Sequence, residues 1–334
     1  MAMNLVTIAD IEKAREAIAG KVARTPMVQS VMLSDRIGVP VWLKLEHRQN
    51  TGSFKLRGAT NALSQLSQAE KQRGVVAAST GNHGRALAYA AQSEGIRAVI
   101  CMSRLVPKNK VDEISRLGAE IRIIGKSQDD AQDEAERLVR DDGLIMVPPF
   151  DNAHIIAGQG TLGLEIVEDL PDVRAVLVPL SGGGLASGIA RAVKAKQANA
   201  KVIGVSMQIG AAMHASLAAG RPVLVEETES LADSLGGGIG LDNQFTFWMV
   251  RELLDEVILL TEQEIADGIA HAYRYEREVI EGAAAVGIGA LLAGKVQAEG
   301  PIAIILSGRN IDMDQHKRII SADKAAESTE PCPA

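Results

Sequence analysis

The chain has 334 residues, of which 46% are hydrophobic and only 3% aromatic, and its formal net charge is −7. This length suffices for two hydrophobic cores, and the many small and aliphatic residues are typical of buried parallel strands covered by helices. The acidic balance argues against a nucleic-acid partner, because no run of Lys and Arg with interleaved aromatic residues offsets it.

The N-terminal residues reach a charged helical pattern at residue 7 with no long apolar segment before it, so we expect no cleaved signal. No later stretch approaches the length of a membrane span, and we therefore expect no membrane partner. Cys101 and Cys332 have neither the number nor the spacing of a disulfide framework or a zinc site. Together these features predict a cytoplasmic protein.

Short apolar runs alternate with helical patterns along the chain, as they do in βαβ units, and this alternation predicts an α/β fold. Near the C-terminus, Thr261 and Glu264 form a capping box before one helix, and Asp312 can cap the last helix. We expect strands at 41–46, 75–79, 97–102, 119–125 and 144–148 and, in a second series, at 174–180, 200–207, 255–261 and 301–308.

The order of these strands predicts two domains. Residues 74–151 would form a small domain, and residues 1–73 and 152–321 a discontinuous large domain, because one strand and the helix after it precede the small block. Residues 322–334 lack apolar periodicity and end in prolines, which predicts a disordered tail. The cleft between the two domains would gather the motifs described next.

The segment S-F-K-L-R-G at 53–58 places Lys55 just inside a predicted helix start. Lysine is usually a solvated surface residue, but here Ser53 can cap the helix, and the neighbours Phe54 and Leu56 can partly desolvate the ammonium group. Desolvation lowers the pKa of a lysine, as a nucleophilic amine requires. The segment therefore predicts a lysine that binds the aldehyde of pyridoxal phosphate (PLP) covalently.

A glycine-rich loop, S-G-G-G at 181–184, follows a predicted strand and opens a helix. Successive N–H groups of such a loop can hold a phosphate dianion, although glycine can also simply relieve crowding at a turn. A second glycine motif, G-x-G-x-x-G at 158–163, resembles a dinucleotide fingerprint. It follows no full strand, and no acidic strand end lies about twenty residues later, so we do not expect a nicotinamide cofactor.

The turn S-T-G-N-H-G at 79–84 lies between a predicted strand and a helix. Asn82 can donate a hydrogen bond to the phenolate oxygen of the cofactor, and the N–H groups of the turn can bind a substrate carboxylate. His83 is either a base or, as we favour, a histidine packed under the turn. Ser307, at the end of the last predicted strand, can meet the pyridine nitrogen, while Glu281 either caps a helix or lies near the cofactor ring.

The five segments TGSFKLRGA, STGNHGRALA, IAGQGT, SGGGLASG and SGRNID, in this order, resemble the serine/threonine dehydratase family of fold-type II PLP enzymes. The resemblance spans Arg24 to about Ile320 and is strongest to the hydroxyectoine-utilisation dehydratases. It implies a tryptophan synthase β-like α/β fold, with two open, twisted, mostly parallel sheets flanked by helices. It also implies a homodimer.

By this resemblance Lys55 would bind the cofactor, then take the Cα proton of a β-hydroxy amino acid whose hydroxyl group is expelled, giving a keto acid and ammonia. Thr80 would offer a second proton-transfer face. The cofactor-binding residues that it implies are Phe54, Lys55, Asn82, Ser181, Gly182, Gly183, Gly184, Leu185 and Ser307. The substrate-binding residues are Ser79, Thr80, Gly81, His83 and Arg309.

Three departures from the family pattern refine the expectation. Thr80 stands where racemases of the family have serine and many deaminases have alanine, and we favour elimination over racemisation. Ser206 follows Gly204-Val205 where metal-stimulated members have an acidic residue, so we expect no metal. Arg309 replaces the second glycine of the usual SGGN, where it either pairs with a second substrate carboxylate or forms a surface salt bridge.

Pairing by Arg309 would favour a 3-hydroxyaspartate-like intermediate of hydroxyectoine degradation as the substrate. Conversion of L-threonine to 2-oxobutanoate and ammonia, dehydration of serine and amino-acid racemisation are the alternatives. Two other classes stay open: a ligand-binding regulator without activity, and a PLP enzyme that catalyses β-replacement.

Overall fold

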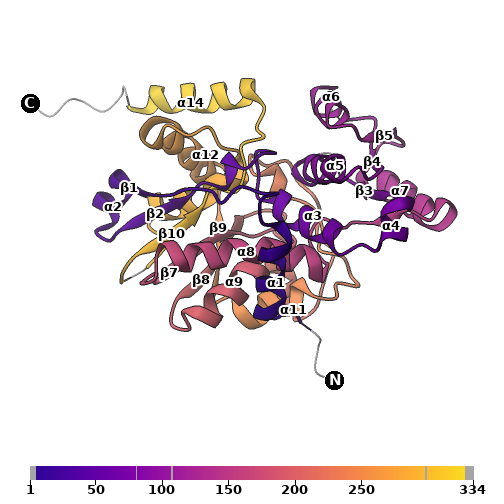
Figure 1. The fold of residues 1–334 in the computed structure, drawn as a ribbon. Coiled ribbons are helices and arrows are strands. Elements are labelled where there is room, and N and C mark those ends of the chain that lie inside the picture. The colour runs from indigo at the N-terminus through magenta and orange to yellow at the C-terminus, as the bar shows by residue number, and fades with distance from the viewer. Residues whose placement is uncertain (1–4, 80, 107, 298, 328–334) are drawn as a thin grey trace, which may run out of the picture.

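The computed structural model describes residues 5–79, 81–106, 108–297 and 299–327 and has the expected α/β fold, with a six-stranded and a four-stranded sheet flanked by helices (Figure 1). The six-stranded sheet has the order β1-β2-β10-β7-β8-β9, and all neighbouring pairs except β1–β2 are parallel. Its strands are β1 (Met27–Ser30), β2 (Val41–Lys44), β7 (Ala175–Pro179), β8 (Lys201–Met207), β9 (Glu256–Leu260) and β10 (Ile302–Ile305).

The four-stranded sheet has the order β5-β4-β3-β6 and is parallel throughout. Its strands are β3 (Val75–Ala78), β4 (Ala98–Met102), β5 (Glu120–Ile123) and β6 (Ile145–Met146). All nine predicted strands are confirmed, and β1 is the strand that the sequence analysis missed. The four strands of this sheet come from one continuous stretch of chain, whereas the larger sheet combines strands from both sides of it. The domain boundaries at 73/74 and 151/152 stay a prediction.

Helices flank both sheets and connect most of the parallel strands (Figure 1). They are α1 (Ile8–Ile18), α2 (Val31–Ile37), α3 (Lys55–Ser64), α4 (Gln68–Arg73), α5 (Asn82–Glu94), α6 (Lys108–Arg116), α7 (Gln128–Asp142), α8 (Ala153–Asp169), α9 (Gly184–Lys196), α10 (Ala212–Ala219), α11 (Thr246–Leu253), α12 (Glu262–His271), α13 (Gly282–Leu292) and α14 (Met313–Glu327). Two 3₁₀ turns, η1 (Glu46–Arg48) and η2 (Asp233–Leu235), and a π-helical turn, η3 (Ala272–Glu276), complete the structure.

Alternate residues of each central strand are buried on opposite faces of its sheet. In β10, Ala303 and Ile305 pack into the cluster that includes α8 and α9, while Ile302 and Ile304 pack into the cluster that includes α13. The smaller sheet divides in the same way between a cluster with α3 and α5 and one with α7. Burial on both faces explains why these strands are continuous apolar runs.

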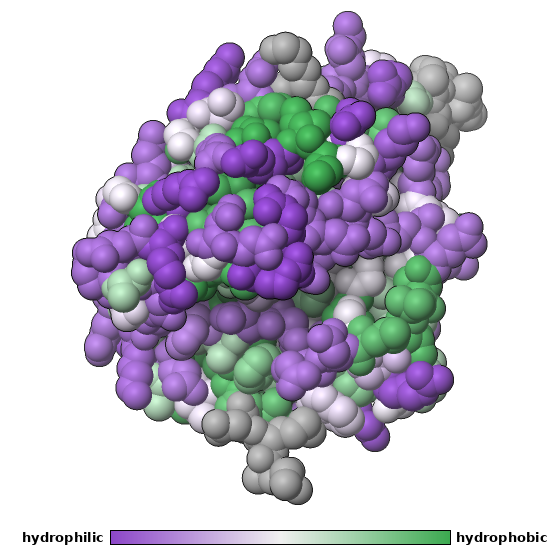
Figure 2. All heavy atoms as spheres, turned by 90° about the vertical axis from the view of Figure 1, so that its right-hand side faces the viewer, coloured by the Kyte–Doolittle hydropathy of each residue, from purple (hydrophilic) through white to green (hydrophobic). Residues whose placement is uncertain are grey.

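The outer face of the smaller sheet's helices is mostly hydrophilic, with separate hydrophobic patches (Figure 2). Helix α7 contributes to this character, because most residues of its sequence, QDDAQDEAERLVRDD, are polar or charged. Among the described residues, none of the helices combines the length and the apolar character needed to cross a bilayer. Cys101 is a free, buried cysteine, and Cys332 lies outside the described residues.

Two predicted helix starts are confirmed, and the predicted tail is partly wrong. Thr261 and Glu264 form the expected capping box, and Asp312 Oδ1 accepts a hydrogen bond of 2.9 Å from the N–H of Gln315. Helix α14, however, continues through residues 322–327, which the sequence analysis assigned to the tail. Ala, Lys and Glu are strong helix formers, so this stretch extends a helix without apolar periodicity. The remaining residues of the predicted tail, 328–334, lie outside the described residues.

Candidate active site

Helix α3 begins at Lys55, as predicted, but Ser53 does not cap it. Phe54 already has helical dihedral angles and is the N-cap residue, with no side-chain capping bond. Ser53 instead forms an isolated β-bridge with Gly308, and its buried hydroxyl has no hydrogen-bond partner among the described residues. The N–H of Phe54 donates to the carbonyl of Ser307 over 3.0 Å. This pairing fixes the lysine segment against the end of β10.

The amine of Lys55 is partly buried between backbone and aromatic groups. Its Nζ donates a hydrogen bond of 2.7 Å to the carbonyl of Pro149 and lies 5.3 Å from the ring centroid of Phe54. Burial lowers the pKa of Lys55 to about 8, although the carboxylate of Glu281 acts in the opposite direction. A much larger fraction of this amine is therefore neutral near pH 7 than of an exposed lysine, as a nucleophile requires.

Glu281 is the N-cap residue of α13, but its side chain makes no capping bond. The carboxylate, in a residue only 4% exposed, accepts hydrogen bonds from Asn82 Nδ2 at 2.8 Å and from the N–H of Asn310 at 3.1 Å. Asn310 in turn donates to Asn82 Oδ1. Of the two roles considered for Glu281, capping is therefore wrong, and its charge acts on Lys55.

A hydrogen bond joins Ser79 and Gly84, the two ends of the turn that the sequence analysis singled out. Ser79 Oγ accepts a hydrogen bond of 3.1 Å from the N–H of Gly84, and Gly81 precedes helix α5. His83 is buried and its Nε2–H donates to the carbonyl of Val147 over 2.7 Å. Burial and the nearby Lys55 charge lower the pKa of His83 to about 3, which favours a packed neutral histidine over a base. Thr80 lies outside the described residues.

The glycine loop connects β7 to the N-terminus of α9, whose cap residue Gly183 has a positive φ of 87° and makes no side-chain capping bond. A Cβ atom at Gly182 would lie 2.5 Å from the ring of Phe150, and one at Gly183 would lie 2.8 Å from Met213 Cε. Only glycine fits both positions. Ser181 is partly exposed at the entrance of the loop, and Leu185 is buried in the core. The first N–H groups of α9 have no intrahelical acceptor, which suits an anion.

The segment Pro149–Phe150, which the sequence analysis did not single out, brings Lys55 and the glycine loop together. The Pro149 carbonyl accepts from Lys55, and the next residue packs against Gly182. The carboxylate of Asp151 then accepts hydrogen bonds of 2.9 and 2.8 Å from the N–H groups of Phe245 and Thr246. A nucleophilic amine and an open helix N-terminus are thereby held at one place, as the aldehyde and phosphate of PLP require.

The G-x-G-x-x-G motif lies within α8, and its glycines serve helix packing. A Cβ at Gly158 would lie 2.5 Å from the carbonyl oxygen of Arg57 in α3, and one at Gly160 would lie 2.9 Å from that of Gly188 in α9. A Cβ at Gly163 would lie 2.8 Å from Ala192 Cβ, also in α9. The motif thus allows α8 to approach both helices closely, in agreement with the expectation that it binds no dinucleotide.

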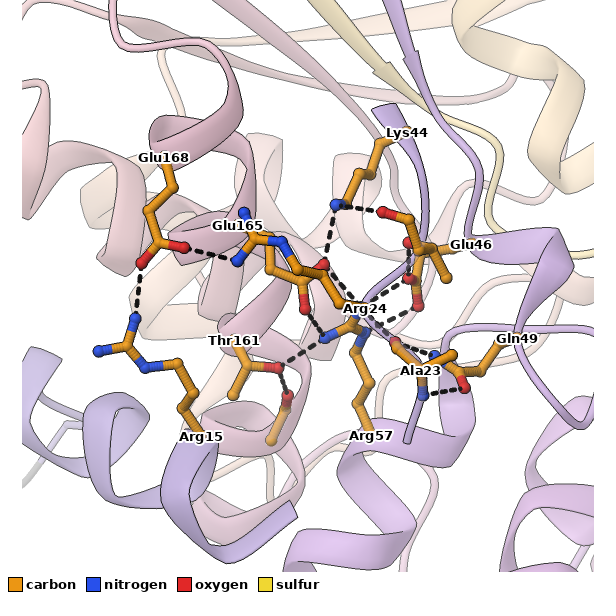
Figure 3. Close-up of polar contacts among 12 residues, drawn as sticks. Arg15, Ala23, Arg24, Lys44, Glu46, Gln49, Arg57, Thr161, Glu165 and Glu168 are labelled. Atoms are coloured by element: carbon orange, nitrogen blue, oxygen red, sulfur yellow. Dashed lines mark hydrogen bonds and ion pairs between the residues drawn. The ribbon is translucent and has the colours of Figure 1, made fainter. Parts of the chain in front are cut away.

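A buried ionic network holds α3 at Arg57, two residues after Lys55 (Figure 3). The guanidinium of Arg57, 1% exposed, pairs with Glu46 at 2.7 Å and with Glu165 at 2.6 Å. Lys44 adds a pair of 2.8 Å to Glu165 from β2. Burial alone would raise the pKa of Glu46, but the charge and hydrogen bonds of Arg57 lower it below its ordinary value. The network joins α3, α8 and β2 and fixes the helix that carries the lysine.

Ser307 and Arg309 lie beside the lysine segment. Ser307 is 2% exposed. The N–H of Arg309 donates to the carbonyl of Gly52 over 2.9 Å, and the exposed Arg309 side chain lies against Gly52, where a Cβ would be 3.2 Å from its Cγ. No group of three or more His, Cys, Asp or Glu side chains with metal-binding geometry occurs in the described ranges.

The two-sheet fold, the low-pKa lysine and the glycine cradle define a fold-type II PLP enzyme. Residues 18–308 match the family model described as "Pyridoxal-phosphate dependent enzyme". The chain therefore belongs to this family, and its cofactor is PLP. Its relatives place it among the serine/threonine dehydratases within that family.

Two curated relatives and two solved structures illustrate the relationship. A putative threonine dehydratase of Sinorhizobium fredii is 62% identical over 96% of both chains, and an L-threonine ammonia-lyase of Thermotoga maritima is 43% identical over 95% of this chain and 79% of the relative. Among solved structures, maize serine racemase is 32% identical, with a TM-score of 0.89 over 97% of this chain and 98% of that one. The processed threonine deaminase isoform 2 of Solanum lycopersicum is 33% identical, with a TM-score of 0.88 over 97% and 92%.

Proposed function

We propose that the protein is an ammonia-lyase that removes water from L-threonine or L-serine by α,β-elimination and yields a 2-oxo acid and ammonia. The observation that carries this proposal is the amine of Lys55, with a pKa lowered to about 8, beside a glycine loop at a helix N-terminus. The similarity to threonine dehydratases and ammonia-lyases supports the reaction type. PLP, when bound, supplies the electron sink that stabilises negative charge at the substrate Cα.

In the proposed reaction Lys55 would hold the cofactor through its amine and, with the substrate bound, would accept the Cα proton at Nζ. The ring of Phe54 lies beside the Lys55 amine and would form the wall of the cofactor pocket next to it. Asn82 would contact the phenolate oxygen, since Glu281 and Asn310 fix its amide. Ser307 would offer the pyridine nitrogen a neutral hydroxyl, a partner that leaves this nitrogen largely unprotonated and suits elimination.

The cofactor phosphate would bind to the N–H groups of Ser181, Gly182, Gly183, Gly184 and Leu185. The turn at 79–84 would bind the substrate carboxylate through the N–H groups of Ser79, Thr80 and Gly81. His83 would support this turn from below through its bond to Val147. With the phosphate and the substrate carboxylate bound by backbone N–H groups, Lys55 would be the group that transfers the proton, and Thr80 is the candidate for a second proton-transferring group.

A 3-hydroxyaspartate-like compound from hydroxyectoine degradation is the second candidate substrate. The exposed side chain of Arg309 lies against Gly52, three residues before Lys55, where a guanidinium can reach a second carboxylate at the mouth of the site. If this is its role, kcat/KM for 3-hydroxyaspartate exceeds that for L-threonine in the wild type, and Arg309→Gly reverses the order. A wild-type preference for L-threonine would leave Arg309 as a surface residue.

Racemisation is a third activity to test, because two serine racemases have the same fold and a sequence identity of about a third to this chain. We also propose a homodimer in the cytoplasm, and a small domain at 74–151 that is separate from the large one. The homodimer rests on the resemblance of the sequence to the dehydratases, the cytoplasmic location on the cysteine usage, and the small domain on the order of the strands.

The decisive assay measures 2-oxo acid release from L-threonine, L-serine, D-serine and 3-hydroxyaspartate without an added nucleophile. We expect turnover by the wild type, loss of it in Lys55→Ala, and no loss in Lys71→Ala, whose lysine forms a partly buried pair with Glu94 in a helix that carries none of the candidate site residues. Turnover that requires an added thiol would indicate β-replacement instead. Bound PLP without any turnover would indicate a ligand-binding regulator.

A further inference from the structure

The side chain of Gln159, in the middle of α8, is buried and has no hydrogen-bond partner among the residues that the structure describes. The residue is 1% exposed, and neither its Nε2 nor its Oε1 is bonded within the part of the chain that the structure describes. A buried amide with both polar atoms unpaired is rare and costly in a folded protein. Such a group indicates a ligand or ordered water that completes its hydrogen bonds.

Two close approaches fix where the Gln159 amide lies. A Cβ at Gly184, the first residue of α9, would lie 2.8 Å from Oε1, and a Cβ at Gly58 in α3 would lie 3.2 Å from Nε2. The amide therefore lies between α3, the helix that carries Lys55, and the N-terminus of α9, which follows the glycine loop and has no side-chain capping bond. The glycines on either side, Gly158 and Gly160, allow the helices to approach closely enough to enclose it.

We propose that Gln159 is a phosphate-binding residue that donates a hydrogen bond from Nε2 to the cofactor phosphate, alongside the backbone N–H groups of the glycine loop. Because neither amide atom is bonded, a half-turn about Cγ–Cδ brings Nε2 to face Gly184 without breaking any hydrogen bond. A neutral amide adds a side-chain donor beside a loop whose own residues, 181–185, carry no side-chain cation, and hydrogen bonds to a charged acceptor are stronger than neutral ones. The inference rests on the proposed role of the loop as the phosphate site.

The test compares PLP with pyridoxal, which lacks the phosphate, as ligands of the apoenzyme. Dissociation constants for both are measured by spectroscopic titration of the wild type, Gln159→Met and Gln159→Glu. The methionine is nearly isosteric and removes the donor, so we expect PLP to bind about 10- to 100-fold more weakly and pyridoxal to be unaffected. The glutamate should weaken PLP binding further, because its charge repels the dianion.

Asn61→Leu is the matched control, since Asn61 is a buried amide at the same α3–α8 interface but donates to the carbonyl of His154. Its ratio of PLP to pyridoxal affinity should equal that of the wild type, and the phosphorus NMR resonance of bound PLP should move only in the Gln159 variants. Equal weakening of both ligands, or an unchanged ratio, would overturn the role of Gln159. A wild type that binds pyridoxal as tightly as PLP would instead overturn the loop as the phosphate site.

Discussion

Replacing Arg57 by methionine tests whether the buried ionic network holds the lysine helix. The guanidinium donates to Glu46 at 2.7 and 2.9 Å and to Glu165 at 2.6 and 3.0 Å, and its own exposure is 1%. Arg57 and Lys44 face the buried carboxylates of Glu46 and Glu165, and Lys44 also pairs with the partly exposed Asp169, so Arg57→Met leaves a negative charge uncompensated in the interior. Removing one partner of a buried ion pair costs about 3–5 kcal/mol of unfolding free energy.

The loss should depend on pH in a defined direction. In the wild type, the pKa of Glu46 lies below its ordinary value, so its contribution to stability is present above about pH 4.5 and fades as pH falls through the lower folded pKa. Without Arg57, burial raises the pKa of Glu46, and the folded variant binds a proton more tightly than the unfolded chain does. The stability difference between wild type and variant should therefore grow as pH rises from about 4 to 7.

Urea denaturation of the apoenzymes at several pH values measures this difference. Arg15→Met is the control, because its pair with Glu168, at 2.6 Å, joins side chains that are 48% and 43% exposed. Such a surface pair contributes about 0–1 kcal/mol. A deficit below about 1 kcal/mol in Arg57→Met, or a deficit that does not vary with pH, would refute the proposed role of the network.

Three further predictions concern the site and its supports. The rate at which the apoenzyme incorporates PLP should rise with pH around a midpoint near 8, because only the neutral Lys55 amine attacks the aldehyde. Glu281→Gln should move this midpoint to lower pH, because the Glu281 carboxylate raises the pKa of Lys55. Stopped-flow absorbance measures the rate in both proteins. Gly158→Ala should destabilise the fold by about 1–3 kcal/mol, because its Cβ would lie 2.5 Å from a carbonyl oxygen of α3, whereas Gly238→Ala, with nothing within 4 Å, should be neutral in thermal denaturation. The imidazole of His83 should show no titration in NMR spectra between pH 5 and 8, since its pKa lies near 3; a midpoint near 6.5 would contradict its burial.

The strands and the start of the lysine helix were predictable because each depends on a local pattern. Buried parallel strands are apolar on both faces, and a short apolar run is visible without knowledge of its neighbours. The strand Met27–Ser30 was missed because it is short, lies at an edge and has a mixed polar pattern. Helix packing likewise explains the glycines at 158–163 only once α3 and α9 are in place.

Groups that act through position were not predictable from their residue type. The carbonyl of Pro149 carries no sequence signal, yet it accepts the hydrogen bond of Lys55. Glu281 occupies an N-cap position but turns its carboxylate toward Asn82, a choice fixed by contacts nearly two hundred residues apart in sequence. Ser53 follows the sequence rule for a cap, but the bridge to Gly308 prevents it. In each case a tertiary contact overrides the local preference.

Borohydride reduction of the PLP-loaded protein, followed by peptide mass spectrometry, tests the central claim most directly. The purified protein should show the visible absorption band of the bound cofactor, and the reduced cofactor should be found on the peptide that contains Lys55. Protein that stays colourless with PLP, or an adduct at another lysine in an active enzyme, would contradict the assignment of Lys55 as the cofactor-binding amine.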